Sequence, residues 1–148
     1  MKKPLLFIAV ITVSLLTLLL AGCSKKDSGS SYSMASVAGS YKLTSATITY
    51  GGVTQDGMDL LFDPCQQDDI LQLKADSSFI YTDAGTTCSS DGSYTGKWYI
   101  SGSYLIQVVG QEKDTANIKS FNGTALVLTG AGDLGGVPFT ATTTMTKQ

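Results

Sequence analysis

Short segments of alternating apolar and polar residues follow one another along most of this chain, separated by glycine- and serine-rich turns. Such alternation is typical of half-buried antiparallel strands, in which every second side chain faces the core. Because the links between segments are short, neighbours in sequence are expected to pair. Eight strands are predicted, at residues 39–50, 70–74, 79–83, 93–100, 104–109, 116–121, 124–129 and 137–146.

Eight antiparallel strands in a meander close most economically into an up-and-down β-barrel, since closure removes the exposed edges of the sheet. The fold class is therefore all-β. An open two-sheet sandwich is the alternative, because periodicity alone does not show closure. In the first strand, Tyr41 and Leu43 share one face and Ile48 has the opposite phase, which predicts a bulge near Ser45. Residues 53–67 are expected to be irregular apart from a short helical turn at 58–62, and loops are expected at 110–114 and 130–136.

Two cysteines, Cys65 and Cys88, flank the predicted hairpin formed by residues 70–74 and 79–83. They lie at equal distances from its turn centre, so they face each other across the open end of the hairpin. The pattern predicts a disulfide, which would stabilise the fold by about 3 kcal/mol. Two unrelated thiols are the alternative.

The first residues of the chain have the pattern of an export signal. Lys2 and Lys3 precede residues 4–22, which carry no charge. The run ends in Leu20-Ala21-Gly22-Cys23, which resembles the bacterial lipobox: an aliphatic residue, two small residues and a cysteine. An uncleaved transmembrane anchor is the alternative, since the run is just long enough to span a bilayer. We therefore expect a signal helix at 1–22, a lipidated cysteine with a flexible polar tether at 23–35, and a folded domain at 36–148.

The lipobox resemblance implies a covalent lipid on Cys23, with three acyl chains that include palmitate. Two or more chains hold a protein firmly to a membrane. Ser24 follows the cysteine where an aspartate often signals retention in the inner membrane. The resemblance therefore implies a cell-envelope protein anchored to the outer membrane, and leaves open which side it faces.

Charge and composition restrict the chemistry of the domain. From Ser36 onward there are six lysines, eleven acidic residues and no arginine, a net charge of −5 that disfavours nucleic-acid binding. The chain has no histidine, so no Ser-His-Asp or Cys-His centre exists. Asp63, Asp68, Asp69 and Asp83 could supply oxygens to calcium, but their spacing matches no known loop, and solvated loop acids are the simpler interpretation. We expect neither catalysis, nor a metal, nor a cofactor beyond the lipid.

Several short motifs resemble those of the lipocalin-like lipoproteins of Bacteroidota. They are Gly39-Ser-Tyr-Lys-Leu43, Asp63-Pro-Cys-Gln-Gln-Asp-Asp69, Gly96-Lys-Trp98 and Ser101-Gly-Ser-Tyr-Leu105. The resemblance implies a barrel that suits small-ligand binding. The chain departs from the family in one place: Tyr41 stands where first strands usually carry tryptophan, the residue that plugs the closed end. Its hydroxyl would need a hydrogen-bond partner there.

Tyr41, Phe79, Tyr81 and Trp98 are the candidate ligand-binding residues, because they fall on the inward face of the predicted strands. The interior of a small barrel is either filled by side chains or holds one small ligand. The resemblance favours a membrane-anchored module for a small apolar or amphipathic ligand. The alternative is a filled barrel acting as a structural or protein-interaction component of the envelope, with an unknown protein partner.

Overall fold

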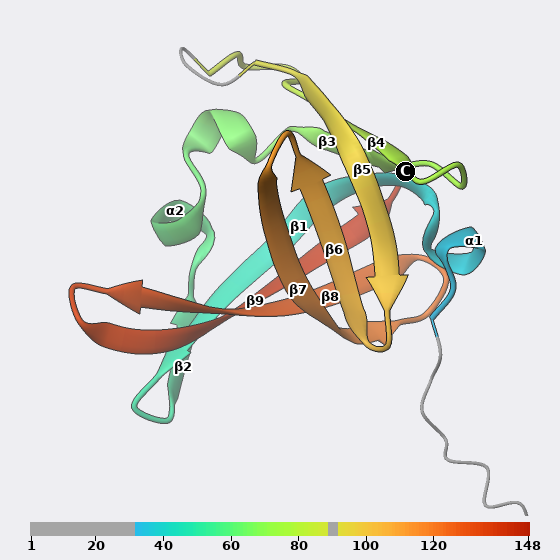
Figure 1. Cartoon of the computed structure of the whole chain (residues 1–148). Helices are drawn as coiled ribbons and strands as arrows, with labels where there is room; N and C mark the ends of the chain where they lie inside the picture. Colours follow the sequence, from blue (N-terminus) through green and yellow to red (C-terminus); the bar gives the residue numbers. More distant parts are fainter. Residues whose placement is uncertain (1–31, 89–91) are drawn as a thin grey trace, which may run out of the picture.

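The alternating segments fold into a closed antiparallel barrel in the computed structural model, which describes residues 32–88 and 92–148 (Figure 1). The described strands are β1 (Gly39–Tyr50), β2 (Val53–Asp56), β3 (Ile70–Leu73), β4 (Ser78–Thr82), β5 (Tyr94–Ser101), β6 (Tyr104–Val109), β7 (Glu112–Phe121), β8 (Ala125–Leu134) and β9 (Val137–Lys147). Three short helices accompany them: α1 (Met34–Val37), α2 (Met58–Leu61) and the 3-10 helix η1 (Pro64–Gln66).

Pairing between β1 and β9 closes the barrel, which confirms the predicted fold class and excludes the open sandwich. Eight strands, β1 and β3 to β9, form the wall. The long strand β1 pairs with β9 along nearly all its length and uses its other edge twice. Its first residues pair with β3, and its last four pair with β2.

The predicted change of phase in β1 is confirmed, since its register with β9 shifts between Leu43 and Ser45. The bulge lets Tyr41 and Leu43 face the interior before it, and Ala46 and Ile48 after it. Without it, half of this strand would present its apolar side chains to solvent.

Three loop predictions are wrong. Residues 53–56, expected to be irregular, form β2, because Gly51 and Gly52 both adopt positive φ and turn the chain directly back onto β1. β7 begins at Glu112 rather than near Ala116, and β8 continues to Leu134 through the expected loop. In each case the turn is shorter than the glycine-rich sequence suggests, and the flanking polar residues extend the strands.

α1 forms upstream of the barrel, and its first two residues come from the predicted tether. The Ser33 side chain accepts a hydrogen bond from the Ser36 backbone, and the Ser36 side chain accepts one from the Ser33 backbone, which fixes the start of the helix. Val37 is fully buried, and Met34 packs against the core. α1 therefore covers one end of the barrel.

The hairpins β1–β2 and β8–β9 project beyond the barrel wall, at the left of Figure 1. The apolar face of these hairpins therefore extends beyond the barrel wall. Of the nine large hydrophobic residues that are exposed within 32–88 and 92–148, five belong to these hairpins or to the adjoining α2, namely Tyr50, Val53, Leu60, Leu134 and Val137. We call this apolar surface the hairpin face.

Candidate ligand-binding site

The end of the barrel beside α1 is filled by side chains. Tyr41, Phe79 and Trp98 are no more than 1 % exposed, and they form one core cluster with Val37 and their neighbours. Each polar group has a partner: the Tyr41 hydroxyl donates to the Val37 carbonyl, and the Trp98 indole N–H donates to a backbone carbonyl of the β3–β4 turn, 2.8 Å away. This packed end supplies the partner that Tyr41 was predicted to need.

Close backbone approach makes the packed end possible. A Cβ on Gly96 would lie 2.4 Å from the Val108 carbonyl oxygen and 2.5 Å from the Phe79 ring. Only glycine therefore allows Phe79 to lie flat against β5. The stem of Lys147 crosses Gly39, and its amine lies 5.7 Å from the centre of the Tyr41 ring, which closes the end against solvent.

The opposite half of the barrel is hollow. An inner chamber of about 160 Å³ lies above the packed end. Its lining is Leu43, Phe62, Gln66, Asp69, Leu71, Tyr81, Tyr94, Gln107, Leu128, Thr143 and Met145. Leu71 and Leu128 also belong to the core cluster, so they form the floor of the chamber.

A wider mouth of about 580 Å³ continues from the inner chamber. The two spaces share Phe62, Gln66, Tyr81 and Tyr94 as walls. The mouth is completed by Leu61, Gly92, Val109, Glu112 and Asp114. Volumes of a few hundred cubic ångströms with mixed apolar and polar walls are those of small-molecule sites.

Two tyrosines form one wall. The Tyr81 and Tyr94 rings are stacked, with centroids 4.8 Å apart and an angle of 20° between their planes. Tyr94 also meets Phe79 edge to face at 6.0 Å, which connects the wall to the packed end. The pairing follows from register, because Tyr81 and Tyr94 are cross-strand neighbours in β4 and β5.

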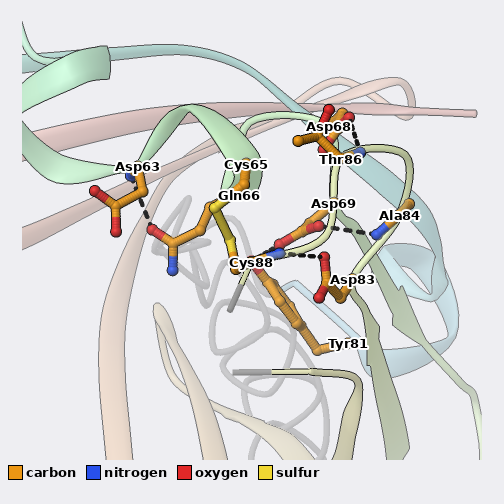
Figure 2. Close-up of a disulfide and its surroundings, with 10 residues drawn as sticks. All are labelled: Asp63, Cys65, Gln66, Asp68, Asp69, Tyr81, Asp83, Ala84, Thr86 and Cys88. Carbon is orange, nitrogen blue, oxygen red and sulfur yellow. Dashed lines mark hydrogen bonds between the residues drawn. A yellow bond between two sulfur atoms is a disulfide. The ribbon is translucent and has the colours of Figure 1, made fainter. Parts of the chain in front are cut away.

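The segment that contains α2 and η1 covers part of the opening and is held by a disulfide (Figure 2). Cys65 in η1 bonds to Cys88, with Cα atoms 5.4 Å apart, so the predicted disulfide is confirmed. In η1, Gln66 Oε1 accepts a hydrogen bond from the Asp63 backbone at 2.9 Å, while Pro64 occupies the first position. The disulfide joins the segment of α2 and η1, which we call the cover, to the open end of the β3–β4 hairpin. Neither of its cysteines belongs to the core cluster of the packed end.

Asp69 anchors the tyrosine wall from inside. It is 5 % exposed and accepts hydrogen bonds from the Tyr81 hydroxyl at 2.6 Å and the Ala84 backbone N–H at 3.0 Å (Figure 2). Burial, and then this hydrogen bond, raise the pKa of Tyr81 well above its usual value. The hydroxyl therefore stays protonated and holds the Asp69 oxygen in place.

Comparison with known families matches residues 37–128 to the lipocalin-like domain. The chain belongs to the lipocalin-like domain family. The match begins at Val37 and runs to Leu128, so it contains the two cysteines of the disulfide and most of the residues that line the inner chamber. No curated protein and no solved structure shows significant similarity to the chain.

Within this lipocalin-like domain, the four candidate ligand residues separate into two groups. Tyr41, Phe79 and Trp98 lie in the packed end and line neither the inner chamber nor the mouth. Tyr81 lines both. The three buried side chains thus support the floor of the chamber, and Tyr81 alone is placed for direct contact with a ligand.

Three of the four aspartates considered as calcium ligands, Asp68, Asp69 and Asp83, accept hydrogen bonds from within the protein. Asp68 accepts a hydrogen bond from the Thr86 backbone at 3.0 Å, and Asp83 accepts one from the Cys88 backbone at 3.4 Å (Figure 2). Asp68 and Asp69 fasten the 83–88 loop to the turn before β3, and Asp83 joins the two ends of that loop. Within residues 32–88 and 92–148, no group of three or more acidic or cysteine side chains is arranged to hold a metal ion.

Cys23 and the signal at 1–22 lie outside the described residues, and the tether is described only from Tyr32 onward. Among the residues that are described, no helix has the length and apolar character needed to cross a membrane.

Several lining residues were missed by sequence reasoning. Tyr94 has the same phase as Trp98, and this is the signal that places it inside the barrel. Glu112 and Asp114 were assigned to a loop, although as strand residues they alternate with Lys113 and face the mouth. Phe62 carried no periodic signal, because it follows a one-turn helix.

Proposed function

We propose that this lipocalin-like domain binds a small amphipathic molecule in the hollow half of its barrel. One observation carries the proposal: the barrel is filled at one end only, and the remaining space is walled by Tyr81, Tyr94 and Phe62. A structural barrel would have no need of an unfilled half, since empty apolar space costs stability. Binding is proposed as the whole activity, without catalysis, because the chain has no histidine and two of its cysteines are joined.

We further propose that the protein is exported, lipidated at Cys23 and anchored to the outer membrane. Support comes from Leu20-Ala21-Gly22-Cys23 after an uncharged run, and from the disulfide, which persists in oxidising compartments such as the bacterial envelope. In cells fed labelled palmitate, label is expected on the wild-type chain and absent from Cys23→Ser. Equal labelling of both chains would contradict lipidation at this residue, and recovery in the inner-membrane fraction would contradict the location.

Binding is tested with the mature chain carrying Cys23→Ser, so that no attached lipid competes for the site. The neutral fluorescent probe N-phenyl-1-naphthylamine should brighten on entering the chamber. Phe62→Ala removes a wall and should weaken the signal, whereas Tyr99→Ala, on the outer face of β5, is the matched aromatic control. An unchanged spectrum with saturating protein, or equal loss in both variants, would count against the proposal.

A second candidate function, a protein contact, is favoured by the hairpin face. It includes a groove of about 300 Å³ lined mainly by apolar residues of β1, β8 and β9 together with Leu60. Asp56, Asp59 and Asp133 flank the hairpins, and no lysine occurs between Lys42 and Lys74. An apolar partner segment with basic flanks therefore fits best.

This contact is tested by photo-cross-linking in intact cells. A photoreactive residue in place of Val137 should trap one defined protein, whereas the same residue in place of Thr140, on the opposite face of β9, should not. Failure to trap any protein from Val137, or equal trapping from both positions, would contradict the contact.

A further inference from the structure

The walls of the cavity carry charge of one sign. Asp69 lines the inner chamber, and Glu112 and Asp114 line the mouth, while no lysine in the described part of the chain lines either space. Since the chain has no arginine or histidine, lysine is the only side chain that could supply a compensating positive charge. The charged side chains that a ligand would meet in this cavity are therefore acidic, which favours a positively charged ligand.

Strand alternation explains why the mouth is acidic. In β7, Glu112 and Asp114 face the mouth, and the intervening Lys113 projects to the other face, where its amine lies 6.0 Å from the centre of the Tyr99 ring. The cross-strand partners of the two acids in β6 are Val109 and Gln107, which carry no charge. Neighbouring strand residues thus leave both carboxylates uncompensated at the mouth.

Aromatic rings line the mouth together with these carboxylates. Tyr94 is 42 % exposed and lines both spaces, and its ring is held parallel to Tyr81. Phe62 adds a ring from the cover segment. The face of an aromatic ring attracts cations and accepts apolar groups equally well, so this wall suits a positively charged group on an apolar body.

We propose that the ligand is an amphipathic cation. Its apolar body occupies the inner chamber above Leu71 and Leu128, and its positively charged group lies in the mouth between the tyrosine wall and the carboxylates of Glu112 and Asp114. This inference rests on the proposed binding function and adds the charge of the ligand to it. The same geometry disfavours anionic amphiphiles such as fatty acids, whose carboxylate would face like charges without a counter-ion.

The test uses three probes with the same ten-carbon tail: decyltrimethylammonium, decanol and decanoate. Each is titrated into the mature Cys23→Ser chain below its micelle concentration, and heat or tyrosine fluorescence is followed. We expect the cation to bind about threefold to tenfold more tightly than the alcohol, as expected for partly exposed charge pairs, and decanoate to bind more weakly than both. The preference should shrink as salt is added.

Charge-neutral variants localise the effect. Glu112→Gln with Asp114→Asn should abolish the preference for the cation over decanol. The ratio of the two affinities is the measure, because both residues line the mouth that either probe enters. Asp56→Asn with Asp133→Asn removes the same number of charges from the hairpins and is the matched control, which should keep the preference. If decanol binds and decyltrimethylammonium binds no more tightly than decanol, the inference about ligand charge is overturned and the binding function stands. If none of the probes binds, both are overturned.

Discussion

The two ends of this barrel are built from the same strands and differ in almost every other respect. At the packed end, Tyr41, Phe79 and Trp98 are fully buried, and each polar atom that they carry has an internal partner. At the open end, the continuing faces of the same strands carry Tyr81, Gln107 and Asp114 around empty space. The difference teaches that stability and binding are separated along the barrel axis, because tight packing and a vacant cavity cannot occupy one layer.

The open end needs a different source of rigidity. The segment with α2 and η1 is joined to the 83–88 loop by the disulfide, and Asp68 and Asp69, which follow η1, accept hydrogen bonds from the backbone of the same loop. The assignment of stability to the packed end and of binding to the open end can be tested by substitutions that should affect only one of the two ends.

Trp98→Ala is expected to have the largest effect on stability, a loss of about 3–5 kcal/mol in the free energy of unfolding. It leaves a cavity in the packed end and a backbone carbonyl of the β3–β4 turn without its indole donor. Urea unfolding followed by circular dichroism measures the loss. Should the alanine variant not fold, Trp98→Phe provides a smaller loss by the same method. A loss below 1 kcal/mol for Trp98→Ala would show that the packed end does not dominate stability.

Removing the disulfide with Cys65→Ser and Cys88→Ser should cost about 3 kcal/mol, since the unfolded chain regains the freedom of the closed loop. The native cover should also loosen, so binding of N-phenyl-1-naphthylamine should weaken, which Trp98→Phe should not cause while the barrel stays folded. Reductant is the control: it should lower the stability of the wild type and leave the double variant unchanged. Unaltered probe binding in the double variant would contradict the prediction that the disulfide holds the open end in shape.

Gly96→Ala should destabilise the barrel by about 1–3 kcal/mol through overpacking. The new methyl group would meet the Val108 carbonyl and the Phe79 ring, and both belong to well-packed strands. Thermal unfolding checks this, with Gly92→Ala as the control, because a Cβ there meets nothing within 4 Å. Equal melting temperatures for the two variants would be inconsistent with close packing against β5.

Tyr41→Phe should cost about 1–2 kcal/mol at neutral pH, because the Val37 carbonyl loses its buried donor. Burial raises the pKa of Tyr41 to about 12 from the ordinary value of 10.0. The folded state therefore keeps this proton while the unfolded state loses it. The associated stability is fully present below pH 10 and is lost as pH rises toward 12.

The alkaline decline in stability should consequently be shallower in Tyr41→Phe than in the wild type when unfolding is measured between pH 9 and 12. Tyr81, whose pKa is also raised by burial and by Asp69, accounts for part of the remaining slope. Tyr99→Phe, at an exposed site, serves as the control and should keep the wild-type slope. A parallel decline in Tyr41→Phe and the wild type would contradict this assignment.

Phe62→Ala should have the smallest effect on stability, less than about 1 kcal/mol, since its side chain is only partly buried and faces the cavity. Its effect on probe binding should nevertheless exceed that of Gly96→Ala. A stability loss comparable with that of Trp98→Ala would mean that the two ends are not separated as described.

Local patterns predicted much of the fold because they are controlled by neighbours in sequence. The alternation of β5 and β6 and the hairpin symmetry of Cys65 and Cys88 depend on pairing between adjacent segments, and the bulge near Ser45 appears as a change of phase within one strand. The errors at β7 and β8 have a common cause: glycine and acidic residues suggested loops, whereas hairpin pairing with β6 and β9 kept them in strands.

The candidate site was predicted less well, because a cavity is an absence of atoms that no residue pattern encodes. Tyr41, Phe79, Tyr81 and Trp98 share the inward face, and sequence alone cannot say at which height along the barrel axis the packing stops. Phe62 lines the cavity from a segment with no strand period, and only the chain path through η1 and the disulfide brings it over the opening.

By itself, the sequence determined an all-β meander, the pairing of Cys65 with Cys88, and a chemistry without histidine, since each depends on residue identity or on short-range spacing. The tertiary structure alone decided that β1 meets β9, that Tyr41 finds the Val37 carbonyl, and that the barrel is hollow above Leu71. The physical reason is that closure and packing depend on contacts between residues as far apart as β1 and β9, where the free energy of the whole barrel, and not local preference, fixes the arrangement.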